Sequence, residues 1–384
     1  MYQIQTLNKI SATGLSRLGE NYTCQDSVEN PDGIILRSFS MHEMELPQSL
    51  RAVARAGAGV NNIPIDKCTE QGVVVFNTPG ANANAVKELV LAGLFLASRK
   101  IVQGIEWTKT LIGEGDAISG LVEKGKSNFA GPELEGKTLG VVGLGAIGVR
   151  VANAAHHLGM EVIGYDPYLS VDAAWSLTRY AHKANDLKTL LQQADYITIH
   201  VPATPQTNGM FNAETFATMK EGARLLNFSR GSLVNEADMI AALSSGKVAA
   251  YVTDFASEAL LQREDVICMP HLGASTPESE ENCAKMAAEE IKDFLENGNI
   301  KNSVNFPNCD MGQVHGTRIT ILHKNVPNML KQFTDALASV NIENMLNKSK
   351  GENAYTMIDV AGELPVDIKA VIEKVDGVIK VVVL

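Results

Sequence analysis

The sequence lacks the cysteine pairs and basic runs that mark several protein classes. Its five cysteines are widely spaced and none forms a CxxC pair, which argues against a disulfide framework and against a zinc site. We therefore expect no metal and a reducing compartment. The net charge is −11 and no run of Lys and Arg occurs, so nucleic-acid binding is not expected. An anionic ligand must instead be met by a local basic pocket.

Long hydrophobic segments are missing as well. No segment approaches about 18 consecutive apolar residues, the length expected of a transmembrane helix. The first residues, MYQIQTLNKI, have neither the basic flank nor the apolar core of a signal peptide. We expect a cytoplasmic protein without membrane contacts.

The length and composition fit an ordinary folded protein. At about 100 to 200 residues per domain, 384 residues predict two or three domains. Hydrophobic residues make up 45% of the chain and charged residues 20%, which excludes wholesale disorder and fibrous repeats.

The chain alternates short strands with helices, the pattern of a parallel α/β sheet. From Gly33, IILRS, LRAVARAG and GVVVFNTPG predict three strands, followed by a helix over 84–100. The stretch 113–136 fits either a flexible joint or a surface helix pair. A second series predicts a doubly wound sheet of six strands near 138–142, 161–165, 196–200, 224–228, 249–253 and 266–269.

The last third of the chain predicts a small additional domain. Thr276, Pro277 and Glu278 supply an N-cap, a first-turn proline and an early acid for a helix to about Glu296. After Asn308 we expect a short polar link. The remaining 70 or so residues follow the order strand, helix, strand, strand, helix, strand, typical of a ferredoxin-like α+β unit.

The segment TLGVVGLGAIG predicts a dinucleotide-binding loop. Gly143, Gly145 and Gly148 have GxGxxG spacing between a strand and a helix, which suits a pyrophosphate at the helix N-terminus. Asp166 ends the next strand, where a carboxylate accepts ribose hydroxyls and repels a 2′-phosphate. This favours NAD over NADP. The alternative is a glycine turn needed only for packing.

Three motifs at predicted strand ends carry ionisable groups, namely Arg230 in NFSRG, Glu258 in DFASE and His271 in PHLGAST. Oxidation of a 2-hydroxy acid needs a base, a cation for the substrate and a carboxylate that holds the base. His271, Arg230 and Glu258 supply this set. Taken singly, each is as well explained as a structural or solvated residue.

These motifs, in this order, resemble the D-isomer-specific 2-hydroxyacid dehydrogenases. The resemblance spans residues 30–384 and includes RAGAGVNNI, NTPGAN and SVNFP. It implies that Arg230, Glu258 and His271 are catalytic. It also implies a Rossmann-type sheet, residues 88–284, inserted in a flavodoxin-like substrate domain of residues 1–87 and 285–305, with a third domain at 317–384.

The resemblance further implies a set of residues at NAD. In many relatives an acid five positions before the catalytic Glu contacts the nicotinamide amide, but that position is Thr253 here. We expect Asp254 to take this role through a small backbone shift. The full expected set is Gly143, Gly145, Ala146, Ile147, Gly148, Asp166, Val201, Phe228, Ser229, Arg230, Asp254, His271, Gly273 and Ala274.

A phosphorylated substrate needs further cations, and the first domain offers Arg37 and Arg55 at strand ends. The alternative for both is surface charge. The expected substrate-binding residues are Arg37, Ser38, Arg55, Ala58, Gly59, Asn77 and Asn82, together with Arg230 and His271.

The tail resembles an ACT domain, a small amino-acid-binding module. His323, Asn325 and Asn341 occupy the positions that match the effector site, and Asn328 replaces a glycine common in that loop. Serine is the expected effector, at an interface with a second subunit. The alternative is a dimerisation module without a ligand.

Within the family, the resemblance is strongest to members that oxidise D-3-phosphoglycerate to 3-phosphohydroxypyruvate with NAD, at the start of serine synthesis, as homodimers or homotetramers. Two alternatives stay open. One is a dehydrogenase for another 2-hydroxy acid, such as glycerate or hydroxypyruvate. The other is an NAD-sensing interaction protein on the same fold.

Overall fold

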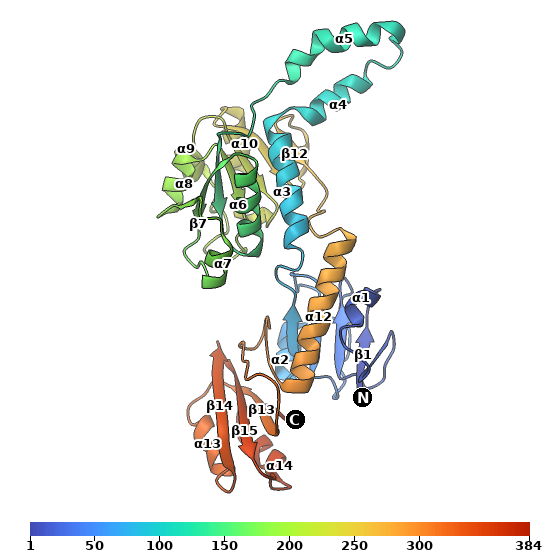
Figure 1. Cartoon of the computed structure of the whole chain (residues 1–384), viewed down its shortest axis with the longest axis vertical. Coiled ribbons are helices and arrows are strands. Elements are labelled where there is room, and N and C mark those ends of the chain that lie inside the picture. Colours follow the sequence, from blue (N-terminus) through green and yellow to red (C-terminus); the bar gives the residue numbers. More distant parts are fainter. The chain divides into compact units, whose positions relative to one another are not determined.

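The computed structural model describes residues 1–384, which divide into two compact units (Figure 1). Unit 1 comprises Met1–Asn82 and Pro277–Leu384, and unit 2 is Ala83–Thr276. The chain passes between the units at the starts of helices α3 (Ala83–Ser98) and α12 (Pro277–Asn297). The crossings lie a few residues before the expected positions, because α3 packs on strands of unit 2 and α12 on strands of unit 1.

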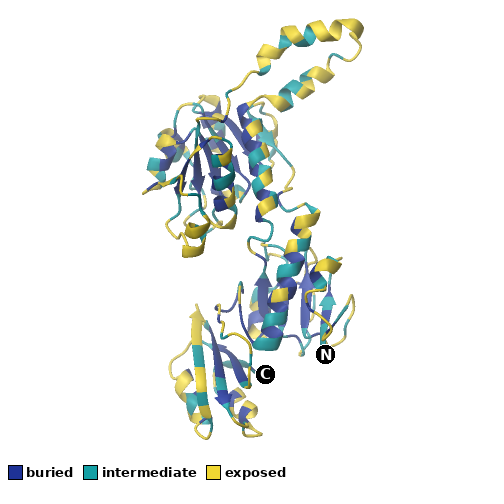
Figure 2. Cartoon of the chain, viewed as in Figure 1, coloured by how far each residue is buried: buried dark blue, intermediate teal, exposed yellow.

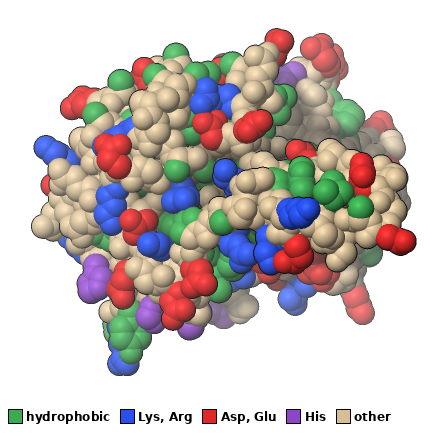
Figure 3. Space-filling model, turned by 90° about the horizontal axis from the view of Figure 1, so that it is seen from above, with side chains coloured by type: hydrophobic (Ala, Val, Ile, Leu, Met, Phe, Trp, Pro, Cys, Tyr) green, Lys and Arg blue, Asp and Glu red, His purple; other side chains and the backbone are tan.

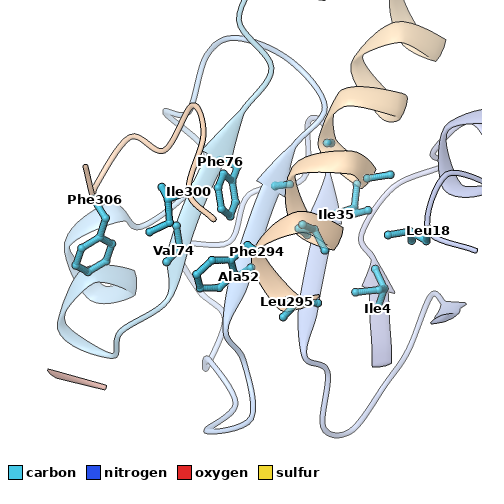
Figure 4. Packing of buried hydrophobic residues seen from close by; sticks show 14 of the residues in the cluster. Ile4, Leu18, Ile35, Ala52, Val74, Phe76, Phe294, Leu295, Ile300 and Phe306 are labelled. Atoms are coloured by element: carbon cyan, nitrogen blue, oxygen red, sulfur yellow. The ribbon is translucent and has the colours of Figure 1, made fainter. Parts of the chain in front are cut away.

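Unit 1 contains a five-stranded parallel sheet of order β2-β1-β3-β4-β5. Its elements are β1 (Tyr2–Thr6), α1 (Ala12–Leu15), β2 (Tyr22–Gln25), β3 (Gly33–Leu36), β4 (Ala52–Arg55), α2 (Ile65–Glu70) and β5 (Val74–Asn77). Helix α12 covers one face of this sheet, where Phe294 and Leu295 share a core with Ile35 and Phe76 (Figure 4). Helix α12, which begins where the chain leaves unit 2, therefore packs on the five-stranded sheet of unit 1.

The tail forms a four-stranded antiparallel sheet of order β14-β15-β13-β16. Its elements are β13 (Thr317–Lys324), α13 (Met329–Ala336), β14 (Asn341–Lys350), β15 (Asn353–Ala361), α14 (Ile368–Glu373) and β16 (Val378–Val383). This confirms the predicted ferredoxin-like unit. Ile319 and Phe333 belong to the core under its helices, whereas Leu322 and Tyr355 belong to the core of the five-stranded sheet. Both faces of the small sheet are thus covered.

The segment after α12 makes contacts inside unit 1 up to Cys309, and most residues of the short polar link expected after Asn308 are exposed. Cys309 is buried and pairs with Ile300 as an isolated bridge. The Tyr355 hydroxyl donates to the Gly298 carbonyl at 2.6 Å, and Lys350 Nζ donates to the Ser303 carbonyl at 2.9 Å. Main-chain carbonyls of this segment therefore serve as hydrogen-bond acceptors inside unit 1.

Unit 2 is a doubly wound parallel sheet of seven strands, in the order β12-β11-β10-β9-β6-β7-β8. The strands are β6 (Thr138–Val142), β7 (Glu161–Tyr165), β8 (Ala181–Lys183), β9 (Tyr196–Ile199), β10 (Ala223–Asn227), β11 (Val248–Thr253) and β12 (Val266–Cys268). The helices around it, besides α3, are α6 (Ala146–His157), α7 (Val171–Ser176), α8 (Leu187–Gln193), α9 (Ala213–Thr218), α10 (Glu236–Ser244) and α11 (Glu258–Leu261). The predicted fold class is confirmed, with β8 as a seventh, short edge strand.

The stretch 113–136, which fits either a joint or a surface helix pair, contains one α-helix, α5 (Ile118–Gly125), flanked by short 3-10 turns, and α4 (Ile101–Lys109) lies just before it. Helices α4 and α5 form an arm of unit 2 that is mostly exposed (Figure 2). Trp107 and Phe129 pack inside this arm with ring centroids 5.2 Å apart. None of the helices is long and apolar enough to cross a membrane. On the face seen in Figure 3, acidic and basic side chains are interspersed.

Candidate active site

The glycine loop of unit 2 has the geometry of a dinucleotide cradle. Gly143 has φ +91°, a region that favours glycine, and an added Cβ would lie 2.6 Å from the His200 carbonyl oxygen. Gly145 is the N-cap of α6, and no atom lies within 4 Å of the position of an added Cβ. An added Cβ at Gly148 would lie 2.0 Å from the Gly143 carbonyl oxygen. The loop is therefore tight beneath and open only at Gly145, which fits a pyrophosphate.

Asp166 is joined to this loop. One carboxylate oxygen accepts from the Leu144 amide and the other from the Tyr168 amide, both at 2.8 Å. The side chain is thereby held at the carboxyl end of β7, with lone pairs left over for ribose hydroxyls. Asp166 thus lies where the sequence predicts an adenosine-ribose acceptor.

The remaining residues expected at the cofactor lie at or after the same strand ends. Val201 lies beside Gly143, and Phe228 packs on Gly93 of α3. The Ser229 hydroxyl donates to the Ile199 carbonyl at 2.6 Å. Gly273 is buried and Ala274 is half-buried, both in the loop before α12, whereas Ala146 and Ile147 open helix α6.

The ionisable groups after β10, β11 and β12 gather around His271. Its Nδ1 atom lies 2.8 Å from Asp254 Oδ2, at hydrogen-bond distance but without hydrogen-bond alignment. Only 1% of the Asp254 side chain is exposed, against 61% of the His271 side chain. Burial raises the pKa of the Asp254 carboxyl, and the charges of His271 and Arg230 oppose this rise. The arrangement is an exposed imidazole next to a buried acid, with Arg230 near enough to act on the pKa of that acid.

Glu258 lies apart from His271 in this structure. It is exposed at the first position of α11, after the N-cap Ser257. No hydrogen bond or ion pair joins it to His271, whose Nδ1 atom lies beside Asp254. The expectation that Glu258 orients the ring stays a prediction. The sequence spacing suggested a carboxylate near His271 but did not show which one faces it.

The expectation that Asp254 takes its role through a small backbone shift stays a prediction, and the pairing of β10 with β11 has one register shift, between Ala223 and Arg224. Thr253 pairs in regular register with Asn227 and Cys268. Its hydroxyl accepts from the Phe255 amide at 3.2 Å. Asp254 is the first residue beyond β11 and leaves one carboxylate oxygen, Oδ1, buried without a partner. That oxygen fits the amide of a bound nicotinamide, so the residues present match the cofactor.

In unit 1, the expected substrate residues meet at the ends of β3, β4 and β5. Arg55 Nε donates to the Arg37 carbonyl at 3.1 Å, and Asn77 Nδ2 donates to the Ala58 carbonyl at 2.6 Å. The Arg55 guanidinium lies directly over Gly57. The structure thus brings Arg37, Arg55, Ala58, Gly59 and Asn77 together, and Asn82 ends this part of the unit.

Two residues absent from the sequence prediction shape this cluster. Asn8 Oδ1 accepts from the amides of Arg37, Ser38 and Phe39, at 2.9 to 3.0 Å. The Arg37 guanidinium forms an ion pair with Glu280 of α12. Asn8 follows β1, a strand whose alternating YQIQT gave no strong signal. Because Asn8 lies far from Arg37 in the sequence, its place beside Arg37 follows only from the pairing of β1 with β3.

The three residues matched to an effector site differ in availability. His323 is buried, and its ring nitrogens lie 2.8 Å from the Lys324 carbonyl and 2.9 Å from the Thr356 hydroxyl. Asn325 Nδ2 donates to the Gly351 carbonyl at 3.2 Å, and Asn341 opens the edge strand β14. His323 is therefore engaged within the tail, while Asn325 and Asn341 are exposed.

Known proteins resemble this chain in sequence and in fold. A family model described as D-isomer specific 2-hydroxyacid dehydrogenase, NAD binding domain, matches residues 91–273. The D-3-phosphoglycerate dehydrogenase of Methanocaldococcus jannaschii is 36% identical over 306 residues, covering 77% of this chain and 55% of that protein. D-3-phosphoglycerate dehydrogenase 1 of Saccharomyces cerevisiae is 31% identical over 343 residues, covering 83% and 70%.

A solved structure supports the same relation. The NAD⁺-bound 3-phosphoglycerate dehydrogenase of Entamoeba histolytica has a TM-score of 0.60 and 25% identity, covering 79% of this chain and 98% of that one. The chain spans about half the length of several curated relatives that it matches.

The doubly wound sheet, the glycine loop and Asp166 define a dinucleotide-binding unit whose cofactor is NAD. The chain belongs to the D-isomer specific 2-hydroxyacid dehydrogenase family.

Proposed function

We propose that the protein interconverts D-3-phosphoglycerate and 3-phosphohydroxypyruvate. Bound NAD supplies the hydride acceptor. His271 takes the proton of the 2-hydroxyl group, and Arg230 binds the carboxylate or the developing carbonyl of the substrate. Positioned proton transfer of this kind typically contributes about 10²- to 10⁴-fold to the rate.

The observation that carries the choice of a phosphorylated acid is the place of Arg55, whose Nε donates to the main-chain carbonyl of Arg37 at the neighbouring strand end. A guanidinium group there, in addition to Arg230, is a cation that a phosphate can use and a plain 2-hydroxy acid does not need, whereas the Arg37 guanidinium is paired with Glu280. The identity of 31 to 38% to several D-3-phosphoglycerate dehydrogenases agrees with this choice. Serine is a further candidate ligand, bridging Asn325 of one subunit and Asn341 of the partner subunit.

The test is NADH oxidation by the purified protein with phosphohydroxypyruvate, hydroxypyruvate and 2-oxoglutarate. We expect the phosphorylated substrate to give the highest kcat/KM. Arg55→Ala should raise KM for phosphohydroxypyruvate far more than for hydroxypyruvate, because a charge-assisted hydrogen bond contributes about 1.5 to 3 kcal/mol. Equal turnover of all three acids would favour a different 2-hydroxy acid, and no turnover would favour an NAD-sensing interaction protein.

A further inference from the structure

We propose that a small anion, of the charge and size of chloride, binds between Arg51 and Lys380, where the tail meets the five-stranded sheet of unit 1. Arg51 lies at the amino end of β4, whereas the candidate active site lies at the carboxyl ends of these strands. The anion site is therefore separate from the active site, and its test does not depend on the proposed function.

Lys380 lies on the inner face of the tail's edge strand β16. It pairs directly with Leu322 of β13, and paired residues on neighbouring strands lie on the same face of a sheet. Leu322 belongs to the core that the tail shares with the five-stranded sheet. Burying an ammonium group on such a face costs free energy unless a partner compensates its charge.

Arg51 approaches the same place from the other side of the junction. Its Nε atom is buried and has no hydrogen-bond partner, and its Cζ atom lies 5.8 Å from the centroid of the Phe294 ring. Lys380 Nζ donates to the carbonyl of Leu50, the residue before Arg51, at 2.6 Å. The two cations are thereby brought to one point of the junction.

No ion pair neutralises Arg51 or Lys380. Burial lowers the pKa of Lys380 to about 8, and the charges of Arg51 and Lys369 contribute to this fall. The charge of Glu296, near the end of α12, acts on Tyr22, and no ion pair joins Glu296 to Arg51. An anion between the two cations would offset both their repulsion and the cost of their burial.

A small cavity lies between the two cations. Its volume is about 10 Å³, and Arg51 and Lys380 line it together with Phe294 and Tyr355. This is room for about one water molecule or one monatomic anion, and a phosphate group does not fit. Since the Tyr355 hydroxyl donates to the Gly298 carbonyl, the donors left for a ligand are Arg51 Nε and the remaining hydrogens of the ammonium group. Both donors are cationic, which favours an anion over water.

The test follows thermal unfolding of the full chain by far-ultraviolet circular dichroism, at constant ionic strength, while sodium gluconate is replaced by sodium chloride. Gluconate is too large for the cavity. We expect chloride at ten times its Kd to raise the unfolding midpoint by about 3 to 6 °C, because it binds the folded protein only. Arg51→Met and Lys380→Met should lose this shift. Lys374→Met, which removes an exposed lysine of the tail, is the control and should keep it.

A second readout needs only the wild type and so decides the matter even where a variant fails to fold. Bromide has the charge of chloride and nearly its size, so crystals grown in sodium bromide should show an anomalous scattering peak between Arg51 and Lys380. A chloride shift of equal size in all four proteins, or bromide peaks at exposed sites only, would overturn the proposal. Lys380 would then serve only as an inward charge that keeps the edge strand β16 from pairing with another chain.

Discussion

At the scale of single residues, Glu290 is a buried carboxyl group of unit 1. It lies on the buried side of α12, where one carboxyl oxygen accepts from Asn302 Nδ2 at 2.7 Å and the other has no partner. Burial raises the pKa of Glu290 to about 8, and the Asn302 hydrogen bond and Lys301 only partly oppose the rise. Since Asn302 also accepts from the Asn77 amide, this acid lies beneath the candidate substrate loop.

The raised pKa of Glu290 predicts a stability that depends on pH. Between pH 4.5 and about 8, the folded protein holds a proton that the unfolded chain has lost. The free energy of unfolding therefore falls as pH rises through this window and levels off above it. Glu290→Gln should remove this decline and gain relative stability at pH 8.5 over pH 5.5 in urea unfolding. The exposed neighbour Glu289→Gln is the control, and identical pH profiles for both variants would contradict the prediction.

Asn328 gives a second prediction at this scale. It precedes α13 with φ +69°, a left-handed conformation that asparagine tolerates better than most residues besides glycine. Asn328→Ala should lower the free energy of unfolding by about 1 to 3 kcal/mol. Asn328→Gly should be close to neutral because glycine adopts this conformation freely. Thermal unfolding compares the two, and an alanine variant as stable as the glycine variant would rule out backbone strain here.

At the scale of elements, the turn from β6 into α6 contains two glycines, one expected to matter for cofactor binding and the other for folding. At Gly145 a methyl group would meet empty space, whereas at Gly148 it would meet the Gly143 carbonyl. Gly145 therefore leaves space for the cofactor, whereas Gly148 is needed for the packing of the turn.

We expect Gly145→Ala to fold like the wild type and to bind NADH at least about tenfold more weakly, which corresponds to ~1.4 kcal/mol. Gly148→Ala should instead lower the unfolding midpoint, because backbone atoms leave no room for its methyl group. NADH fluorescence titration and thermal unfolding separate the two effects. Unchanged NADH affinity in Gly145→Ala would remove this residue from the cofactor site.

The same elements show how far the sequence leads. Strands β3 to β7 and β9 to β12 are predicted because each has a compact apolar run before a turn. β1 and β2 are missed because YQIQT and YTCQ mix polar and apolar residues, and β8 is missed because three edge residues carry almost no pattern. Their places are set by pairing partners far along the chain.

For the site, the glycine spacing identifies the loop, since it reflects local backbone needs. The partner of His271 is different. Asp254 and Glu258 lie four positions apart on one segment, and which of them faces the ring depends on where β11 ends and α11 begins. Spacing alone does not fix that. Similarly, the ion pair between Arg37 and Glu280 joins residues more than 200 positions apart.

At the scale of the whole molecule, one buried arginine joins the tail to the rest of unit 1. Only 1% of Arg318 is exposed, and it forms a two-pronged ion pair with Asp359 at 2.6 and 2.9 Å. The same guanidinium donates to the carbonyls of Asn297, Gly312 and Met311 at 2.8 to 3.1 Å. It thus connects the end of α12, the segment after it and two strands of the tail.

This arrangement predicts that Arg318→Met destabilises unit 1 by about 3 to 5 kcal/mol, because it leaves a carboxylate and three carbonyl groups without their donor. Both tryptophans, Trp107 and Trp175, lie in unit 2, so their fluorescence follows that unit, whereas far-ultraviolet circular dichroism follows the whole chain. In urea, the variant should show an early dichroism transition and an almost unchanged fluorescence transition. Lys331→Met, which removes an exposed ion pair, is the control and should cost less than about 1 kcal/mol. A fluorescence transition that moves as far as the dichroism transition would mean that the two units unfold as one, and an Arg318→Met variant as stable as the control would mean that this arginine does not hold the tail in place.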